Sequence, residues 1–127
     1  MTKVLMIAAG GAVGSSLRYV VAGWGQRLTI GAFPIGTLTV NVVGCLLIGV
    51  LGALFAGPVR LRDEYKLAIM VGALGGFTTF STFGWETLSL VNDAQYGRAL
   101  LNVLGTNILA LAAVWIGYRL SQHFWGV

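Results

Sequence analysis

The sequence predicts an all-α integral membrane protein with four transmembrane helices in one domain covering residues 1–127. Hydrophobic residues make up 57% of the chain and charged residues only 9%, whereas about a quarter of the residues in soluble domains are charged. The mean hydropathy is +0.84. Charged residues are missing from four blocks, each a candidate membrane span: residues 4–17, 28–59, 67–85 and 99–118.

The chain carries a net charge of +4, but its basic residues do not cluster as a nucleic-acid-binding surface would require. They lie between apolar runs and are interpreted as anchors at the membrane interfaces: Lys3, Arg18, Arg27, Arg60, Arg62, Lys66, Arg98 and Arg119. The single cysteine, Cys45, lies within an apolar run. The sequence therefore predicts neither a disulfide framework nor a cysteine metal site.

The first helix is expected at about residues 3–24. Lys3 and the apolar residues after it also have the pattern of a secretory signal peptide. The apolar block nevertheless continues past Arg18 to Trp24, which is long enough to span a membrane. Arg18 then lies within or near the end of this helix, where an isolated charge needs a partner or must reach the interface.

The second helix is expected at about residues 35–56. Pro34 suits the first turn of a helix, and Gly57 with Pro58 ends it. The last helix is expected at about residues 98–121 and ends with aromatic residues typical of a membrane interface: Trp115, Tyr118 and Trp125.

The third helix, at about residues 66–91, is expected to be broken mid-membrane near residues 75–78. Gly75 and Gly76 stand beside a run of β-branched and hydroxyl residues, which is poor helix-forming chemistry. Non-helical backbone at membrane depth is tolerated only where it is buried in protein or lines a wet cavity. We therefore expect half-helices at about 66–74 and 79–91, and the break indicates a functional site.

Glycine pairs spaced four apart suggest close helix packing. Gly10 with Gly14 and Gly72 with Gly76 have the small-xxx-small spacing that lets two backbones approach. Packing is favoured over contact with an ion. The basic residues favour cytoplasmic termini, because the terminal side of a four-span chain carries most of them: Lys3, Arg60, Arg62, Lys66 and Arg119, against Arg27 and Arg98.

Enzymatic functions are not predicted. His123 is the only histidine, and the four carboxylates lie in or near loops or helix ends, so no catalytic pair or metal cluster is indicated. Neutral hydrogen-bonding residues remain inside the spans, where either interhelical bonding or pore lining explains each: Thr37, Thr39, Asn41, Thr78, Thr79, Ser81, Thr82, Asn102, Thr106 and Asn107. Asn41 needs a partner helix or a ligand, because its amide cannot satisfy itself.

Phe80 and Phe83 are three residues apart, on one helical face beside Ser81 and Thr82. Such residues are most often core or lipid-facing aromatics. The edge of a phenyl ring is positive, however. Together with neutral donors it can replace part of the hydration shell of a small anion and still allow release.

Three motifs resemble the Fluc (CrcB-type) fluoride channels, bacterial proteins of about this length with four helices. They are GGAVGSSLRY at 10–19, GTLTVNVVGC at 36–45 and GGFTTFSTFGWE at 75–86, in the family's order. The resemblance implies a fluoride-selective passive channel in the bacterial inner membrane that exports fluoride from the cytoplasm. It also implies an antiparallel, dual-topology homodimer with two pores, although the charge bias counted above does not favour dual topology.

The resemblance assigns roles residue by residue. Phe80 and Phe83 match phenylalanines that flank the fluoride path, Asn41 matches an asparagine that donates to the anion, and Ser81 and Thr82 are expected beside them. The helix 4 match is weaker, and Thr106 is the best candidate there, with Asn102 less certain. Arg18 and Glu86 are assigned to a vestibule or a structural ion pair. The backbone carbonyls of Gly75 and Thr78 are expected to hold a structural sodium ion at the dimer centre.

Two alternatives stay open. A proton-coupled exporter resembling the small multidrug transporters would share the size and the antiparallel dimer, but those transporters depend on a buried glutamate in the first helix, which this sequence lacks. A non-transporting membrane scaffold would use the polar residues only for packing, and it leaves the break in the third helix unexplained. The absence of an ionisable relay through the spans favours a channel over a pump.

Overall fold

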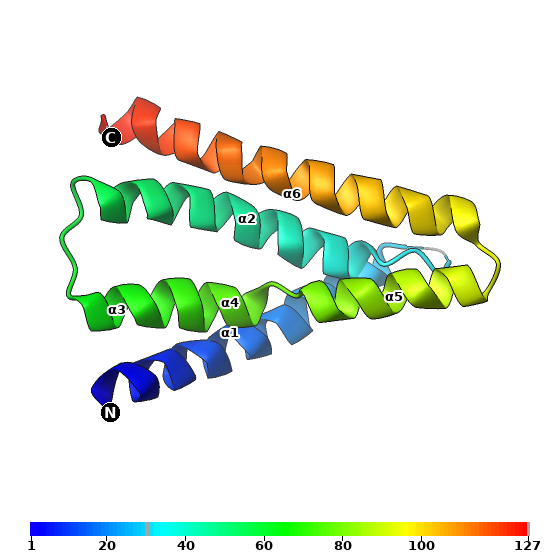
Figure 1. The fold of residues 1–127 in the computed structure, drawn as a ribbon, viewed down its shortest axis with the longest axis horizontal. Coiled ribbons are helices and arrows are strands. Elements are labelled where there is room, and N and C mark those ends of the chain that lie inside the picture. Colours follow the sequence, from blue (N-terminus) through cyan, green and yellow to red (C-terminus); the bar gives the residue numbers. More distant parts are fainter. Residues whose placement is uncertain (30, 127) are drawn as a thin grey trace.

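The computed structural model describes residues 1–29 and 31–126, and every regular element in them is a helix. Four long helical segments run roughly side by side (Figure 1). They are α1 (Thr2–Arg27), α2 (Ile35–Ala56), a third segment between Asp63 and Asn92, and α6 (Tyr96–Trp125). All four are long and apolar enough to cross a membrane, so the chain is a multi-pass membrane protein.

The third segment is composite. It consists of α3 (Asp63–Leu67), the π-helical turn η1 (Ala68–Leu74), α4 (Gly75–Phe77) and α5 (Phe80–Asn92). The element α1 packs against α2, η1 and α4, while α6 packs against α2 and α5. Both termini and the α2–α3 connection lie at one end of the molecule, and the α1–α2 and α5–α6 connections lie at the other (Figure 1).

The observed helices agree with the expected ranges in position, but α1 and α6 are longer than expected. The range expected for the second helix, 35–56, matches α2. The ranges 3–24 and 98–121 were too short, because α1 continues to Arg27 and α6 runs from Tyr96 to Trp125. Polar residues at a membrane interface do not interrupt a helix, so the uncharged blocks mark only the apolar part of each helix.

The chain leaves the helical conformation at Thr78 and Thr79, whose backbone is extended, with ψ angles of 161° and 120°. The range expected for the break, near 75–78, includes Thr78 but not Thr79. Gly75 and Gly76 lie in α4, because Gly76 is needed for packing: a Cβ there would come within 2.8 Å of the Gly11 carbonyl oxygen of α1. The β-branched threonines adopt the extended conformation instead.

The glycine pairs serve close packing between α1 and the third segment. A Cβ on Gly72 would lie 2.6 Å from the Ile7 carbonyl oxygen, and Gly10 and Gly14 approach the backbone of Ala68 and Ala73 in the same way. The packing interpretation of these glycines is confirmed. Such contacts fix α1 against the helical turns that precede the extended residues.

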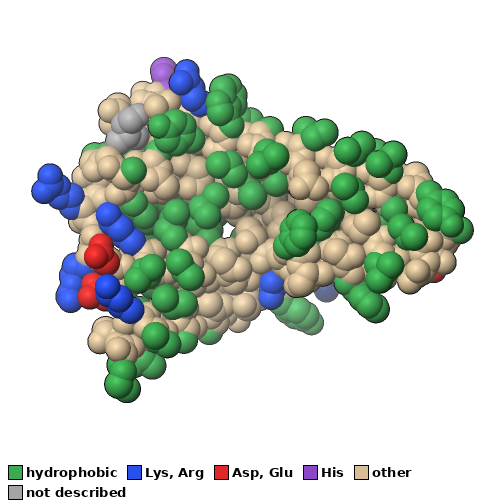
Figure 2. Space-filling view, in the orientation of Figure 1, with side chains coloured by type: hydrophobic (Ala, Val, Ile, Leu, Met, Phe, Trp, Pro, Cys, Tyr) green, Lys and Arg blue, Asp and Glu red, His purple; other side chains and the backbone are tan. Residues whose placement is uncertain are grey.

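Basic side chains gather at the end of the molecule that holds the termini and the α2–α3 connection, whereas the visible face elsewhere is largely apolar or neutral (Figure 2). An ion pair there joins Arg62 to Glu64 at 3.6 Å. This distribution is the charge asymmetry counted in the sequence.

Candidate functional site

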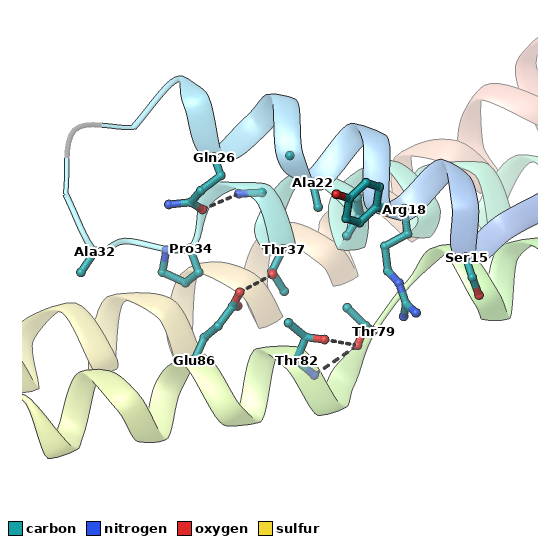
Figure 3. A pocket seen from close by; sticks show the side chains of 14 residues that line it. Ser15, Arg18, Ala22, Gln26, Ala32, Pro34, Thr37, Thr79, Thr82 and Glu86 are labelled. Atoms are coloured by element: carbon teal, nitrogen blue, oxygen red, sulfur yellow. Dashed lines mark hydrogen bonds between the residues drawn. The ribbon is translucent and has the colours of Figure 1, made fainter.

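A cavity of about 650 Å³ opens between α1, α2, the extended residues and α5 (Figure 3). Its polar lining comes from all four of these parts: Arg18, Gln26, Thr37, Thr79, Thr82 and Glu86. Except for Gln26, these residues belong to sequence motifs that are far apart along the chain, and helix packing brings them together. Three predicted site residues, Arg18, Thr82 and Glu86, therefore share one polar surface with Gln26, Thr37 and Thr79.

Glu86 is held by α2. Its Oε1 accepts a hydrogen bond from the Thr37 hydroxyl at 2.7 Å (Figure 3). Its Oε2 is buried and has no hydrogen-bond partner among the described residues. One oxygen of the carboxyl group is thus fixed, and the other remains available to a proton, a water molecule or a donor entering the cavity.

Arg18 points from α1 towards the extended residues (Figure 3). Its Nη1 donates to the Thr78 carbonyl oxygen at 3.3 Å. Among the described residues, neither Arg18 nor Glu86 lies within ion-pair distance of an opposite charge. The two residues line the same cavity. Arg18 supplies the cavity with a positive charge.

Thr79 organises the start of α5. Its Oγ1 accepts a hydrogen bond from the Thr82 backbone N–H at 3.2 Å and donates to the Thr82 hydroxyl at 3.0 Å. The Ser81 hydroxyl lies 3.3 Å from the same oxygen. This is an N-cap, which satisfies a backbone donor that the first turn of a helix leaves unpaired. Thr79 and Thr82 line the cavity, and the Ser81 hydroxyl lies next to Thr79.

Asn41 is buried and engages the backbone of Thr79 twice. Its Nδ2 donates to the Thr79 carbonyl oxygen at 3.0 Å, and the Thr79 N–H donates to its Oδ1 at 2.8 Å. The buried Asn41 side chain, which was expected to need a partner helix or a ligand, has its hydrogen-bond partner in the third helical segment. One Nδ2 hydrogen is left over, because a carboxamide carries two.

Phe80 and Phe83 adjoin each other at the start of α5, with ring centroids 5.3 Å apart and planes tilted by 47°. Their environments differ sharply. Phe83 is only 6% exposed, whereas Phe80 is 79% exposed on the outer surface of the chain. An aromatic ring this exposed, beside polar hydroxyls, is available to a second molecule.

A second polar cluster lies between α5 and α6. The Thr106 hydroxyl donates to Asn102 Oδ1 at 3.3 Å, and Asn102 Nδ2 donates to the Thr87 hydroxyl at 2.9 Å. Thr87 in turn donates to the Phe83 carbonyl oxygen at 2.8 Å. Thr106 does not line the cavity around Arg18 and belongs instead to this cluster behind Phe83.

The carbonyls of Gly75 and Thr78 lie at the C-terminal end of α4, where helix carbonyls lack intrahelical partners. The Thr79 N–H, which would continue the helix by donating to Gly75, donates to Asn41 instead. Gly75 is exposed at the surface of the chain. Free carbonyl oxygens at a helix C-terminus suit a hard cation, although the Thr78 oxygen already accepts from Arg18.

The sequence reasoning missed two residues as site residues. Thr87 anchors the second cluster, and its position four residues after Phe83 was the available signal. Gln26 closes the outer part of the cavity: its Nε2 donates to the Phe33 carbonyl oxygen at 3.2 Å, and the Gly36 N–H donates to its Oε1 at 3.5 Å. Nothing in the local sequence indicated these contacts of Gln26.

Comparison with known proteins identifies relatives over nearly the whole chain. The profile of a family described as CrcB-like protein, Camphor Resistance (CrcB), matches residues 5–118. A protein from Helicobacter pylori strain J99, named fluoride-specific ion channel FluC, is 46% identical over 97% of this chain and 95% of its own length. Proteins with the same name from Helicobacter acinonychis and Maridesulfovibrio salexigens are 47% and 43% identical, over 94% and 96% of this chain and 95% and 97% of theirs.

Proposed function

Because the chain belongs to the CrcB-like family of ion channels, a family of channels and not of enzymes, we propose that it is a fluoride-selective passive channel. The family predicted from the sequence motifs is confirmed. We further propose that the channel exports fluoride from the cytoplasm across the bacterial inner membrane. The observation that carries the proposal is the meeting of neutral donors, one guanidinium and two phenyl rings around the extended residues Thr78 and Thr79.

The chemistry of this site suits a small, strongly hydrated anion. Arg18 draws anions towards the cavity, and the hydroxyls of Ser81 and Thr82 together with the spare N–H of Asn41 replace water molecules one at a time. The ring edges of Phe80 and Phe83 add weak positive potential without fixed charge. Such binding is weak enough for the ion to leave. Thr106 remains a candidate on α6, because its long bond to Asn102 lets the hydroxyl rotate.

A second copy of the chain is part of the proposal. Phe80 stands 79% exposed beside the proposed path, and a phenyl ring that flanks an ion needs an opposing wall. An antiparallel homodimer with dual topology would supply that wall twice, once for each of two pores. Gly75 is exposed on the same segment, so its carbonyl could be shared at the centre of the dimer.

We propose that a sodium ion is held by the Gly75 and Thr78 carbonyls of both subunits and so joins them. The donor set fits, because carbonyl oxygens at a helix C-terminus favour a hard cation and acidic side chains are not required. When bound, the ion supplies a fixed positive charge at the dimer centre. Arg18 would then share the Thr78 carbonyl with it.

The proposal is tested by anion efflux from liposomes that contain the purified protein. Wild-type protein is expected to release fluoride much faster than chloride. Phe80→Ile should lower fluoride efflux about two- to tenfold, which corresponds to losing aromatic contact energy of the usual size. Phe124→Ile, an exposed aromatic near the C-terminus, should leave efflux unchanged. Equal release of both halides, or no fluoride release, contradicts the proposal.

A further inference from the structure

We infer that Asn41 is a positioning residue whose side-chain carboxamide clamps the backbone of Thr79 and so fixes the start of α5. The inference deepens the proposed function and rests on it, because α5 carries the residues assigned to the fluoride path. It gives Asn41 a role besides direct contact with the anion. The observation is the reciprocal pair of hydrogen bonds between residues 38 positions apart in the chain.

The backbone of Thr79 needs an outside partner. Thr79 is extended and stands between α4 and α5, so neither helix supplies its donor and acceptor. It is only 8% exposed, as is Asn41. A buried peptide group without hydrogen bonds is costly, and more so inside a membrane, where water cannot replace the missing partner. Asn41 satisfies both polar atoms at 3.0 and 2.8 Å.

Few side chains can do this. The carboxamide presents one donor and one acceptor at the spacing of a peptide group, so it pairs with Thr79 as a neighbouring strand would. A serine hydroxyl is too short to bond both atoms of Thr79. Serine can nevertheless still donate to an anion. This difference separates a clamping role from a purely ligating one.

The clamp affects the proposed fluoride path indirectly, because Thr79 fixes the start of α5. The Thr79 hydroxyl caps α5 by accepting from the Thr82 N–H, and the first turn of α5 carries Phe80 and Phe83. Displacing Thr79 therefore removes the cap and moves both rings. The clamp also orients Asn41 itself, because its carboxamide plane is fixed by two bonds and its remaining N–H has one direction.

The experiment compares Asn41→Ala and Asn41→Ser with wild type and with Asn107→Ala. Asn107 is a matched control, because it is exposed and its Nδ2 bonds the Val103 carbonyl oxygen of its own helix. Hydrogen exchange of the Thr79 amide is followed by NMR of threonine-labelled protein, without fluoride. Slow exchange in wild type and in Asn107→Ala, and at least about tenfold faster exchange in both Asn41 variants, is expected from the loss of one buried hydrogen bond.

Fluoride efflux of the same four proteins completes the test. Both Asn41 variants should lose at least about tenfold in efflux. Unchanged Thr79 exchange in Asn41→Ala, or efflux of Asn41→Ser within about twofold of wild type, overturns the clamp. A wild-type protein that releases no fluoride contradicts the proposed function instead, and the exchange measurement, which needs no fluoride, still decides the clamp.

Discussion

Replacing Asn102 with alanine is expected to destabilise the packing of α5 on α6. Asn102 is 1% exposed. Its Nδ2 donates to Thr87 of α5, whereas the bond that it accepts from Thr106 lies within α6. Interhelical hydrogen bonds in membrane proteins contribute about 0.6 kcal/mol each on average, and up to about 1.7 kcal/mol. Thr87 already donates to the Phe83 carbonyl oxygen of its own helix, and the Thr106 hydroxyl can turn to a carbonyl of α6, so they add little further cost. The loss of the one interhelical bond should therefore be about 0.6–1.7 kcal/mol.

The assay is equilibrium unfolding in mixed micelles at fixed protein concentration, followed by tryptophan fluorescence. A double-mutant cycle with Thr87→Val should give a coupling energy of at least about 0.5 kcal/mol. Ser121→Ala serves as the additive partner, because Ser121 bonds the Val50 carbonyl oxygen at 2.9 Å and lies roughly 28 Å from Asn102 along α6. If Asn102→Ala unfolds like wild type, or couples equally to both sites, the assignment of this cluster is refuted.

Three further outcomes are expected. Gly72→Ala should destabilise the protein by about 1–3 kcal/mol in the same unfolding assay, because its Cβ meets the backbone of α1, whereas Gly105→Ala, which meets nothing within 4 Å, should be neutral or stabilising. Thr37→Val should lower fluoride efflux, because Glu86 loses the hydroxyl donor that holds its Oε1, while Thr39→Val, whose hydroxyl bonds its own helix, should retain wild-type efflux. Replacing sodium with a large organic cation should reduce efflux if the proposed carbonyl site holds sodium, and unaltered efflux would remove that part of the proposal.

The number and positions of the transmembrane helices follow from the apolar character of the bilayer. A bilayer excludes charge, so the uncharged blocks located all four spans, and Pro34, Gly57 and Pro58 gave the limits of α2 correctly. The expected break also included Gly75 and Gly76, which lie in α4, because glycine has two opposite uses. Gly76 is a packing residue in a helix, and its low helix propensity is overridden by the close approach of Gly11.

The site could be predicted only in part. Residue types and motif order made Asn41, Phe80 and Phe83 candidates, but no local pattern reveals that Asn41 binds the backbone of a residue 38 positions away. Nor does it reveal that one phenyl ring is buried and the next exposed. These features depend on how α2, α5 and the extended residues pack, which is a property of the whole fold.

The most direct test of a fluoride-selective passive channel is its reversal potential in a planar bilayer. With a tenfold fluoride gradient and equal chloride on both sides, the current should reverse at the fluoride equilibrium potential, about 59 mV in magnitude, and a pH gradient should not move it. A reversal potential near zero would show that the protein does not select fluoride. One that shifts with the pH gradient would show coupled transport, and either result contradicts the account.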